Sequence, residues 1–206
     1  MATSKDVRSK VRRLQSGAPL RLVYTGRLER MKGAEHLVEV ARQLQIPFTL
    51  DIYGDGTLRT EMQDAIRRWS LNDRVRIHQP IDFSTALIPM LRTEADLFLC
   101  CHVQSDPSCT YLETLGCGVP IVGYANRAWK GLLSKADAGW SVQLRRPALM
   151  AKKVEELHGS RDELCSKIDG AISFARKHSF EDEFRRRVEH LVQLSAEEDT
   201  FLQARD

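Results

Sequence analysis

The chain has 206 residues, of which 42% are hydrophobic and 29% charged, values typical of a soluble globular protein with one packed core. The formal net charge is +3, and residues 1–13 carry five basic side chains against one acidic one, so the remainder is nearly neutral. A nucleic-acid-binding domain would carry its lysines and arginines across the folded surface, so we expect no nucleic acid partner. Residues 1–19 are interpreted as a basic leader or linker.

The sequence gives no sign of membrane insertion, secretion or metal binding. No apolar run reaches the ~20 residues that a bilayer-spanning helix needs, and the start of the chain lacks the apolar stretch of a secretory signal. The five cysteines form no CxxC pair, which favours free thiols in the cytoplasm. Cys100, Cys101 and His102 are adjacent at the end of a predicted strand, where neighbouring residues point to opposite faces, so core packing is favoured over metal ligation.

Apolar runs alternate with stretches of helical period along the chain. Strands are expected at 22–24, 48–53, 75–79, 97–101, from 121 onward, and more weakly at 141–144. Helices are expected between them, near 37–44, 58–69, 87–91 and 110–117, the last one ended by Gly118 with Pro120 just beyond. This alternation predicts an α/β fold over residues 20–178, with a doubly wound, parallel, six-stranded Rossmann-like sheet.

The chain is wholly helical in character after residue 147. Ser179 and Asp182 have the spacing of a helix cap, and apolar side chains follow at helical spacing, at Phe180, Phe184, Val188, Leu191 and Leu194. Residues 179–206 are therefore expected to form an amphipathic helical extension that packs on another surface.

Two loops follow the carboxyl ends of predicted strands, which is where ligands bind in open parallel sheets. With the common strand order 3-2-1-4-5-6, the crevice lies beside strands one and four. The first loop, residues 26–33, presents Arg27, Arg30 and Lys32 just before a helix start, which suits a diphosphate but also a solvated basic loop. It has neither the Walker A pattern nor the GxGxxG glycines, so cationic side chains would replace a glycine cradle.

The second loop, residues 102–113, is long and polar and leads into a helix. Amide groups near Thr110 to Leu112 could face a phosphate at that helix start. Glu113, one turn inside the helix, could accept hydrogen bonds from two ribose hydroxyls or simply interact with the helix dipole. The residues alone leave both interpretations open.

Four segments, in order and at matching spacing, resemble the C-terminal, donor-binding lobe of family 4 retaining glycosyltransferases of the GT-B fold. The resemblance covers about residues 20–192, and its matching segments are Gly26-Arg27-Leu28 with Lys32-Gly33, Tyr53-Gly54-Asp55-Gly56, Ala95-Asp96-Leu97, and the run Tyr111-Leu112-Glu113-Thr114-Leu115-Gly116-Cys117-Gly118-Val119-Pro120-Ile121-Val122.

The resemblance implies a site for a UDP- or GDP-linked sugar. Arg27 and Lys32 would hold the diphosphate and stabilise its charge during catalysis, and Glu113 would bind the ribose. The other implied donor-binding residues are Gly26, Gly54, Ile81 beside the base, Thr110, Tyr111 and Leu112. The first glutamate of the family's Glu-x7-Glu motif falls on Ser105, with Asp106 the nearest acid, so these two are candidate sugar contacts. No metal or other cofactor is expected.

The resemblance also implies a partner and a reaction. A second, N-terminal GT-B lobe would hold the acceptor, would be contacted by residues 179–206, and would be the only route to peripheral membrane association. The expected reaction is transfer of a hexosyl unit, with retention, to a carbohydrate or glycolipid, as in polysaccharide biosynthesis. The chain alone is expected to be an inactive fragment. Alternatives are a nucleotide-linked oxidoreductase domain that uses Asp55, and a non-catalytic interaction module that uses the last helix.

Overall fold

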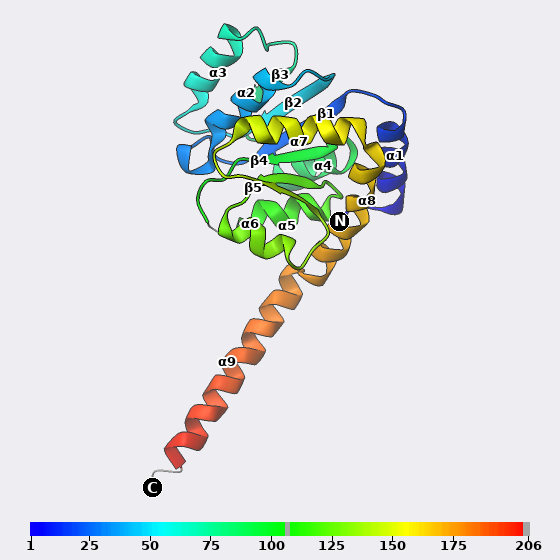
Figure 1. The fold of residues 1–206 in the computed structure, drawn as a ribbon. Coiled ribbons are helices and arrows are strands. Elements are labelled where there is room, and N and C mark those ends of the chain that lie inside the picture. Colours follow the sequence, from blue (N-terminus) through cyan, green and yellow to red (C-terminus); the bar gives the residue numbers. More distant parts are fainter. Residues whose placement is uncertain (106–107, 204–206) are drawn as a thin grey trace.

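The computed structural model describes residues 1–105 and 108–203 and contains a six-stranded sheet in the order β3-β2-β1-β4-β5-β6 (Figure 1). All neighbouring strands are parallel. The strands are β1 (Leu20–Thr25), β2 (Phe48–Tyr53), β3 (Val75–His78), β4 (Leu97–Cys100), β5 (Ile121–Tyr124) and β6 (Gly139–Val142). The predicted fold class and strand order are confirmed.

Burial explains why these segments form strands. Every residue of the central strand β4 is buried, as its unbroken apolar sequence predicts, whereas β2 alternates between buried and partly exposed residues. β1 and β2 pair in register from Leu20 opposite Phe48 to Thr25 opposite Tyr53. The two strands therefore end side by side, and the loops that follow them start from the same edge of the sheet.

Helices cover both faces of the sheet. α2 packs beside α7 and α5 packs beside α8, and Figure 1 shows α7 in front of the sheet and α4 behind it. The helical elements after β1 are the 3-10 turn η1 (Arg30–Lys32), α2 (Ala34–Gln43), α3 (Arg59–Arg68), the π-helical turn η2 (Phe83–Leu87), α4 (Ile88–Thr93), α5 (Cys109–Gly116), α6 (Arg127–Leu133), α7 (Pro147–Gly159), α8 (Arg161–Lys177) and α9 (Phe180–Gln203).

Most of the segment interpreted as a basic leader or linker, residues 1–19, is folded against the rest of the domain. Residues before β1 form the helix α1 (Ser4–Gln15), which packs beside α8 and α4 and begins with a capping box between Thr3 and Asp6. Leu14 is 1% exposed and Lys10 only 2%. The number of basic residues in this segment does not indicate which of them are buried and hydrogen-bonded in the folded protein.

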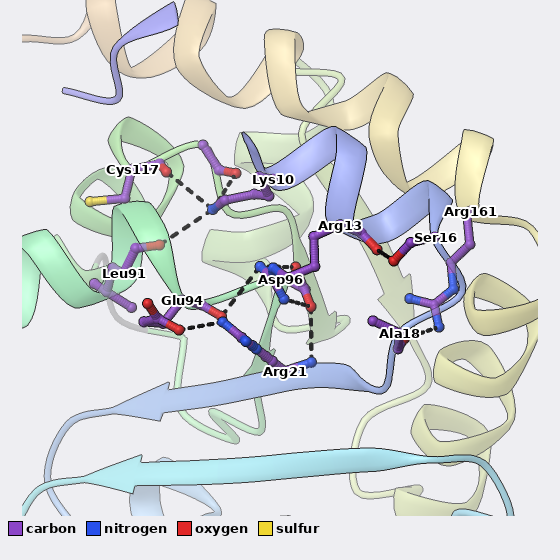
Figure 2. A network of polar contacts seen from close by, with 11 residues as sticks. Lys10, Arg13, Ser16, Ala18, Arg21, Leu91, Glu94, Asp96, Cys117 and Arg161 are labelled. Carbon is purple, nitrogen blue, oxygen red and sulfur yellow. Dashed lines mark hydrogen bonds and ion pairs between the residues drawn. The ribbon is translucent and has the colours of Figure 1, made fainter. Parts of the chain in front are cut away.

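Asp96 ties α1 to the sheet. Asp96 directly precedes β4 in the sequence, and its side chain is buried. Its carboxylate accepts hydrogen bonds from the guanidinium of Arg13 at 2.7 Å and from the backbone amide of Arg21 in β1 at 2.9 Å (Figure 2). The charge on Arg13 is thereby used to join the helix to two neighbouring strands.

The last helix extends away from the rest of the protein (Figure 1). Its predicted start is confirmed, since the amide of Asp182 donates to the hydroxyl of Ser179 at 3.1 Å. The predicted apolar side chains that can be described are 48–64% exposed, at Phe184, Val188, Leu191 and Leu194; the side chain of Phe180 is outside the described part. Within residues 1–105 and 108–203, no helix combines the length and hydropathy needed to cross a bilayer.

Two elements differ from expectation. β6 lies at Gly139–Val142, two residues before the predicted 141–144, and α6 (Arg127–Leu133) was not predicted.

Candidate functional site

A cleft of about 380 Å³ opens where the carboxyl ends of β1, β2 and β3 approach the start of α5. It is lined by Thr25, Gly26, Arg27, Tyr53, Gly54, Asp55, Pro80, Ile81, Leu87, Thr110 and Glu113. This is the edge of an open parallel sheet at which ligands bind.

The cleft gathers most of the predicted donor-binding residues. Those that line it are Gly26, Arg27, Gly54, Ile81, Thr110 and Glu113. Lys32, Ser105, Tyr111 and Leu112 do not line it, and Asp106 lies outside the described residues. Arg27 and the start of α5 are therefore brought together from segments about eighty residues apart in the sequence.

Backbone contacts hold the two predicted loops against each other. The carbonyl of Met31, in η1, accepts hydrogen bonds from the amides of Val103 and Gln104, each at 3.3 Å. Gly33 has a φ of 59°, and a Cβ atom there would lie 2.2 Å from the carbonyl oxygen of Cys101. Only glycine allows this approach, so the Lys32-Gly33 pair of the predicted motif has a structural reason.

Arg27 is the cation at the mouth of the cleft. The buried Tyr24 donates its hydroxyl hydrogen bond to the carbonyl of Arg27 at 3.0 Å, which anchors the loop. The guanidinium itself is exposed and lies 3.7 Å from the sulfur of Met31. An exposed guanidinium on an anchored backbone is well placed to bind an anionic group.

Lys32 lies elsewhere. It closes η1 and is only 8% exposed, so its side chain is not part of the cleft wall. Of the two predicted diphosphate-binding cations, only Arg27 lines the cleft, and contact of Lys32 with a ligand stays a prediction.

Glu113 faces the cleft from α5. Its side chain is partly buried, and this burial raises the pKa of its carboxyl group. A carboxylate that is partly withdrawn from water accepts hydrogen bonds strongly from paired hydroxyl groups. Thr110, one turn earlier, brings the start of the helix to the same wall.

Apolar side chains also line the cleft. Ile81 is 38% exposed, and Pro80 and Leu87 are the other apolar side chains of this part of the lining. A flat, partly apolar ring fits such residues, while polar groups on the ring or on its substituents can reach the polar residues that line the same cleft.

Arg59 organises the floor of the cleft and was not identified from the sequence. Its guanidinium donates to the carbonyls of Gly54 at 2.8 Å, His78 at 3.2 Å and Ile77 at 3.4 Å, which joins the ends of β2 and β3. One signal was available: Arg59 is the first residue of α3, where a positive charge opposes the helix dipole.

The side chains of Tyr111 and Ser105 point towards α6. The ring of Tyr111 stacks on Trp129 with centroids 5.2 Å apart, and its hydroxyl accepts from the amide nitrogen of Asn126 at 3.3 Å. The hydroxyl of Ser105 accepts from the backbone amide of Arg127 at 3.1 Å. These contacts join the second loop and the start of α5 to α6.

Comparison with known proteins places this geometry in a family. The family model described as glycosyl transferases group 1 matches residues 8–171. No curated protein matches the sequence significantly.

Several solved structures share the fold. Anabaena Alr3699/HepE in complex with UDP and glucose is 20% identical, with a TM-score of 0.75 over 95% of this chain and 53% of that one. Sucrose-phosphate synthase from Thermosynechococcus elongatus is 18% identical, with a TM-score of 0.79 over 95% of this chain and 50% of that one. The chain thus spans about half the length of these two proteins.

A third structure is itself a single domain. The C-terminal domain of a glycosyl transferase group 1 family protein, LpcC from Francisella tularensis, is 13% identical, with a TM-score of 0.69 over 85% of this chain and 93% of that one. The match of the family model over most of the sequence, together with this fold, shows that the chain belongs to the glycosyl transferases group 1 family, as a domain of GT-B type.

Proposed function

We propose that the chain is the donor-binding lobe of a retaining glycosyltransferase that uses a UDP- or GDP-linked hexose. The observation that carries the proposal is the cleft itself, in which Arg27, Glu113 and the apolar side chain of Ile81 line one space. Structures of HepE with UDP and with UDP-glucose support a uridine nucleotide as the first ligand to test.

Each wall of the cleft matches one part of a nucleotide sugar. The base lies against Ile81, the two ribose hydroxyls donate to the carboxylate of Glu113, and the diphosphate lies between Arg27 and the start of α5 at Thr110. Backbone groups near Tyr111 and Leu112 extend the same helix start. Contacts of Lys32, Ser105 and Asp106 with the donor stay predictions.

The proposed chemistry is electrostatic. When the bond between the anomeric carbon and the diphosphate breaks, negative charge grows on the departing oxygen atoms. A guanidinium already positioned at that place stabilises the charge without reorganisation, and Arg27 is the cation on the cleft wall. Transfer with retention to a carbohydrate or glycolipid hydroxyl belongs to the proposal through the family resemblance.

We propose that α9 contacts a second, N-terminal lobe that supplies the acceptor site. The helix leaves the body of the protein with its apolar side chains exposed, including Phe184 and Leu191 at 50% and 64%. An apolar stripe of this kind is normally covered in a folded protein. The chain alone is then expected to bind nucleotide and to transfer no sugar.

Calorimetric titration of the folded chain with UDP, GDP and NAD⁺ tests the proposal. Saturable binding of UDP or GDP, with no heat from NAD⁺, is the expected result. Binding of NAD⁺ alone would favour the oxidoreductase alternative and its ribose-binding Asp55. The absence of detectable binding to all three ligands would contradict the donor-lobe proposal and favour an interaction module.

A further inference from the structure

The C-terminal end of α5 is completed by an unusual set of donors. The helix ends in a Schellman motif, in which the amide of Gly118 donates to the carbonyl of Leu115 at 2.9 Å and the amide of Val119 donates to the carbonyl of Thr114 at 3.3 Å. The next three carbonyl groups, those of residues 116–118, take no part in these two bonds.

Residues that precede β1 satisfy all three. The backbone amide of Ala2 donates to the carbonyl of Gly116 at 2.7 Å. The ammonium group of Lys10 donates to the carbonyls of Cys117 at 3.4 Å and Gly118 at 3.1 Å (Figure 2).

Lys10 also reaches a second helix. It donates to the carbonyl of Leu91, in the last turn of α4, at 3.3 Å (Figure 2). One ammonium group therefore caps the C-terminal ends of two neighbouring helices, where the helix dipoles favour a positive charge.

The opposite ends of these elements line the cleft. α5 carries Thr110 and Glu113 at or near its start, and η2, which runs directly into α4, carries Leu87. With 8 residues, α5 is about 12 Å long at ~1.5 Å per residue, so a tilt at one end moves the other.

Packing alone does not account for a lysine here. Burial lowers the pKa of Lys10 to about 8, while the facing charge of Asp96 favours the protonated form; Cys117, Arg13 and Asp6 are the other titratable groups around it. A buried charge is commonly less stabilising than an apolar side chain of similar volume. The lysine therefore needs a reason other than the filling of space.

We infer that Lys10 is a positioning residue for the donor cleft, because its ammonium group fixes α4 and α5 at the ends that lie away from the ligand. It acts on the nucleotide indirectly, through Thr110 and Glu113 on α5 and through Leu87 before α4. The inference rests on the proposed function of the cleft.

The test compares Lys10→Met, Lys10→Arg and the control Arg12→Met, an exposed position on the same helix, in UDP and GDP titrations at pH 7 and pH 9. We expect Lys10→Met to weaken binding about tenfold at pH 7, Lys10→Arg to restore most of the loss, and Arg12→Met to have no effect. At pH 9 the wild-type lysine is largely neutral, so the ratio between wild type and Lys10→Met is expected to shrink to about twofold. The ligand's own titration affects all four proteins alike and cancels in this ratio.

Equal affinities of wild type and Lys10→Met at pH 7 would overturn the inference, and so would an equal loss at both pH values, which would indicate packing alone. If Lys10→Met does not fold, Lys10→Gln, which keeps an N–H donor without the charge, replaces it. If wild type binds neither nucleotide, the proposed function fails, and amide hydrogen exchange of residues 109–113 decides the positioning role. Faster exchange in Lys10→Met than in Arg12→Met supports it, and identical exchange overturns it.

Discussion

Gly54 and Gly26 meet at the ends of β2 and β1 so closely that a Cβ atom on Gly54 would lie 1.9 Å from the carbonyl oxygen of Gly26. The amide of Gly26 also donates to the carbonyl of Tyr53 at 3.0 Å, which continues the strand pairing beyond Thr25. Because both glycines line the cleft, its floor is made of backbone, and its shape depends on the absence of a side chain.

Gly54→Ala is expected to force β1 and β2 apart at their ends. The overpacking should lower the free energy of unfolding by about 1–3 kcal/mol and weaken nucleotide binding at the same time. Urea denaturation and calorimetry measure the two effects. The control is Gly131→Ala in α6, where an added Cβ meets nothing within 4 Å and should stabilise the helix by about 0.5–1 kcal/mol. An unchanged stability for Gly54→Ala would contradict the close approach.

Arg27→Ala should remove the cation from the cleft wall. A charge-assisted hydrogen bond to phosphate contributes about 1–3 kcal/mol, so the affinity for UDP or GDP should fall by about tenfold or more, with little change in stability because the side chain is exposed. Arg30→Ala is the matched control, since Arg30 belongs to the same loop but pairs with Glu61 at 2.9 Å. An equal effect of both variants would point to the general charge of the loop.

Lys32→Ala tests whether the buried cation of this loop reaches the diphosphate. If it does, binding should weaken by about 1–3 kcal/mol, as for Arg27→Ala. Calorimetry gives the affinity, and urea denaturation shows whether the loss of a buried side chain also affects folding. A variant that binds as well as wild type would remove Lys32 from the donor site.

Glu113→Gln should change stability and affinity in opposite directions. Burial raises the pKa of this carboxyl group in the folded state, so the ionised form opposes folding at pH 7 and the neutral amide does not. The thermal midpoint should rise on the order of 1 °C, and this gain should vanish as the pH falls below the ordinary glutamate pKa of about 4.3, where the wild-type side chain is neutral in both states.

The same variant loses an acceptor for the ribose hydroxyls, so its affinity for UDP or GDP should fall by about 1–3 kcal/mol. Glu189→Gln, an exposed change on α9, should alter neither quantity. Full affinity in Glu113→Gln would show that the carboxylate does not bind the ribose.

Asp6→Asn should loosen α1. Burial raises the pKa of Asp6, but hydrogen bonds from the Thr3 backbone and the Arg92 side chain outweigh this effect and lower the pKa to about 2. The unfolded value is about 3.9, so this carboxylate stabilises the fold above that pH and its contribution is lost as the pH falls towards 2.

At pH 7 the variant should be less stable by about 1–2 kcal/mol, and the difference should be smaller at pH 3. Urea denaturation at the two pH values measures it. Asp73→Asn, at an exposed position, serves as the control, and a deficit that stays constant with pH would contradict this account.

The sheet could be predicted because its signals are local. β2 is predicted at 48–53 from its residues and the glycine-rich turn that follows, and the observed strand order is the common one assumed for such an alternation of strands and helices. β6 was misplaced because its position depends on pairing with β5: Gly139 lies opposite Ile121, where a Cβ atom would come within 2.1 Å of the Ile121 carbonyl oxygen. α6 could not be predicted because it has only seven residues, of which Trp129 alone is buried, and so it shows almost no helical periodicity of apolar residues.

The site could be predicted only in part, for a similar reason. Arg27 and Glu113 stand in loops whose residue types suggest a ligand, and both line the cleft. Arg59 bonds to the carbonyl of Gly54 nearby and to those of Ile77 and His78 eighteen and nineteen residues away, and its place at the start of α3 does not indicate which carbonyl groups it meets. Lys32 belongs to the same basic loop as Arg27 but is 8% exposed and does not line the cleft, so its contact with a ligand stays a prediction.

The docking of α1 sets where this domain can be cut. A version that starts at Leu20 would remove the amide of Ala2 and the ammonium group of Lys10, and three carbonyl groups beside α5 would have to find water instead. It would also uncover the apolar surface against which Leu14 packs. We therefore expect a stably folded isolated domain to require the first nineteen residues, although none of them lines the cleft.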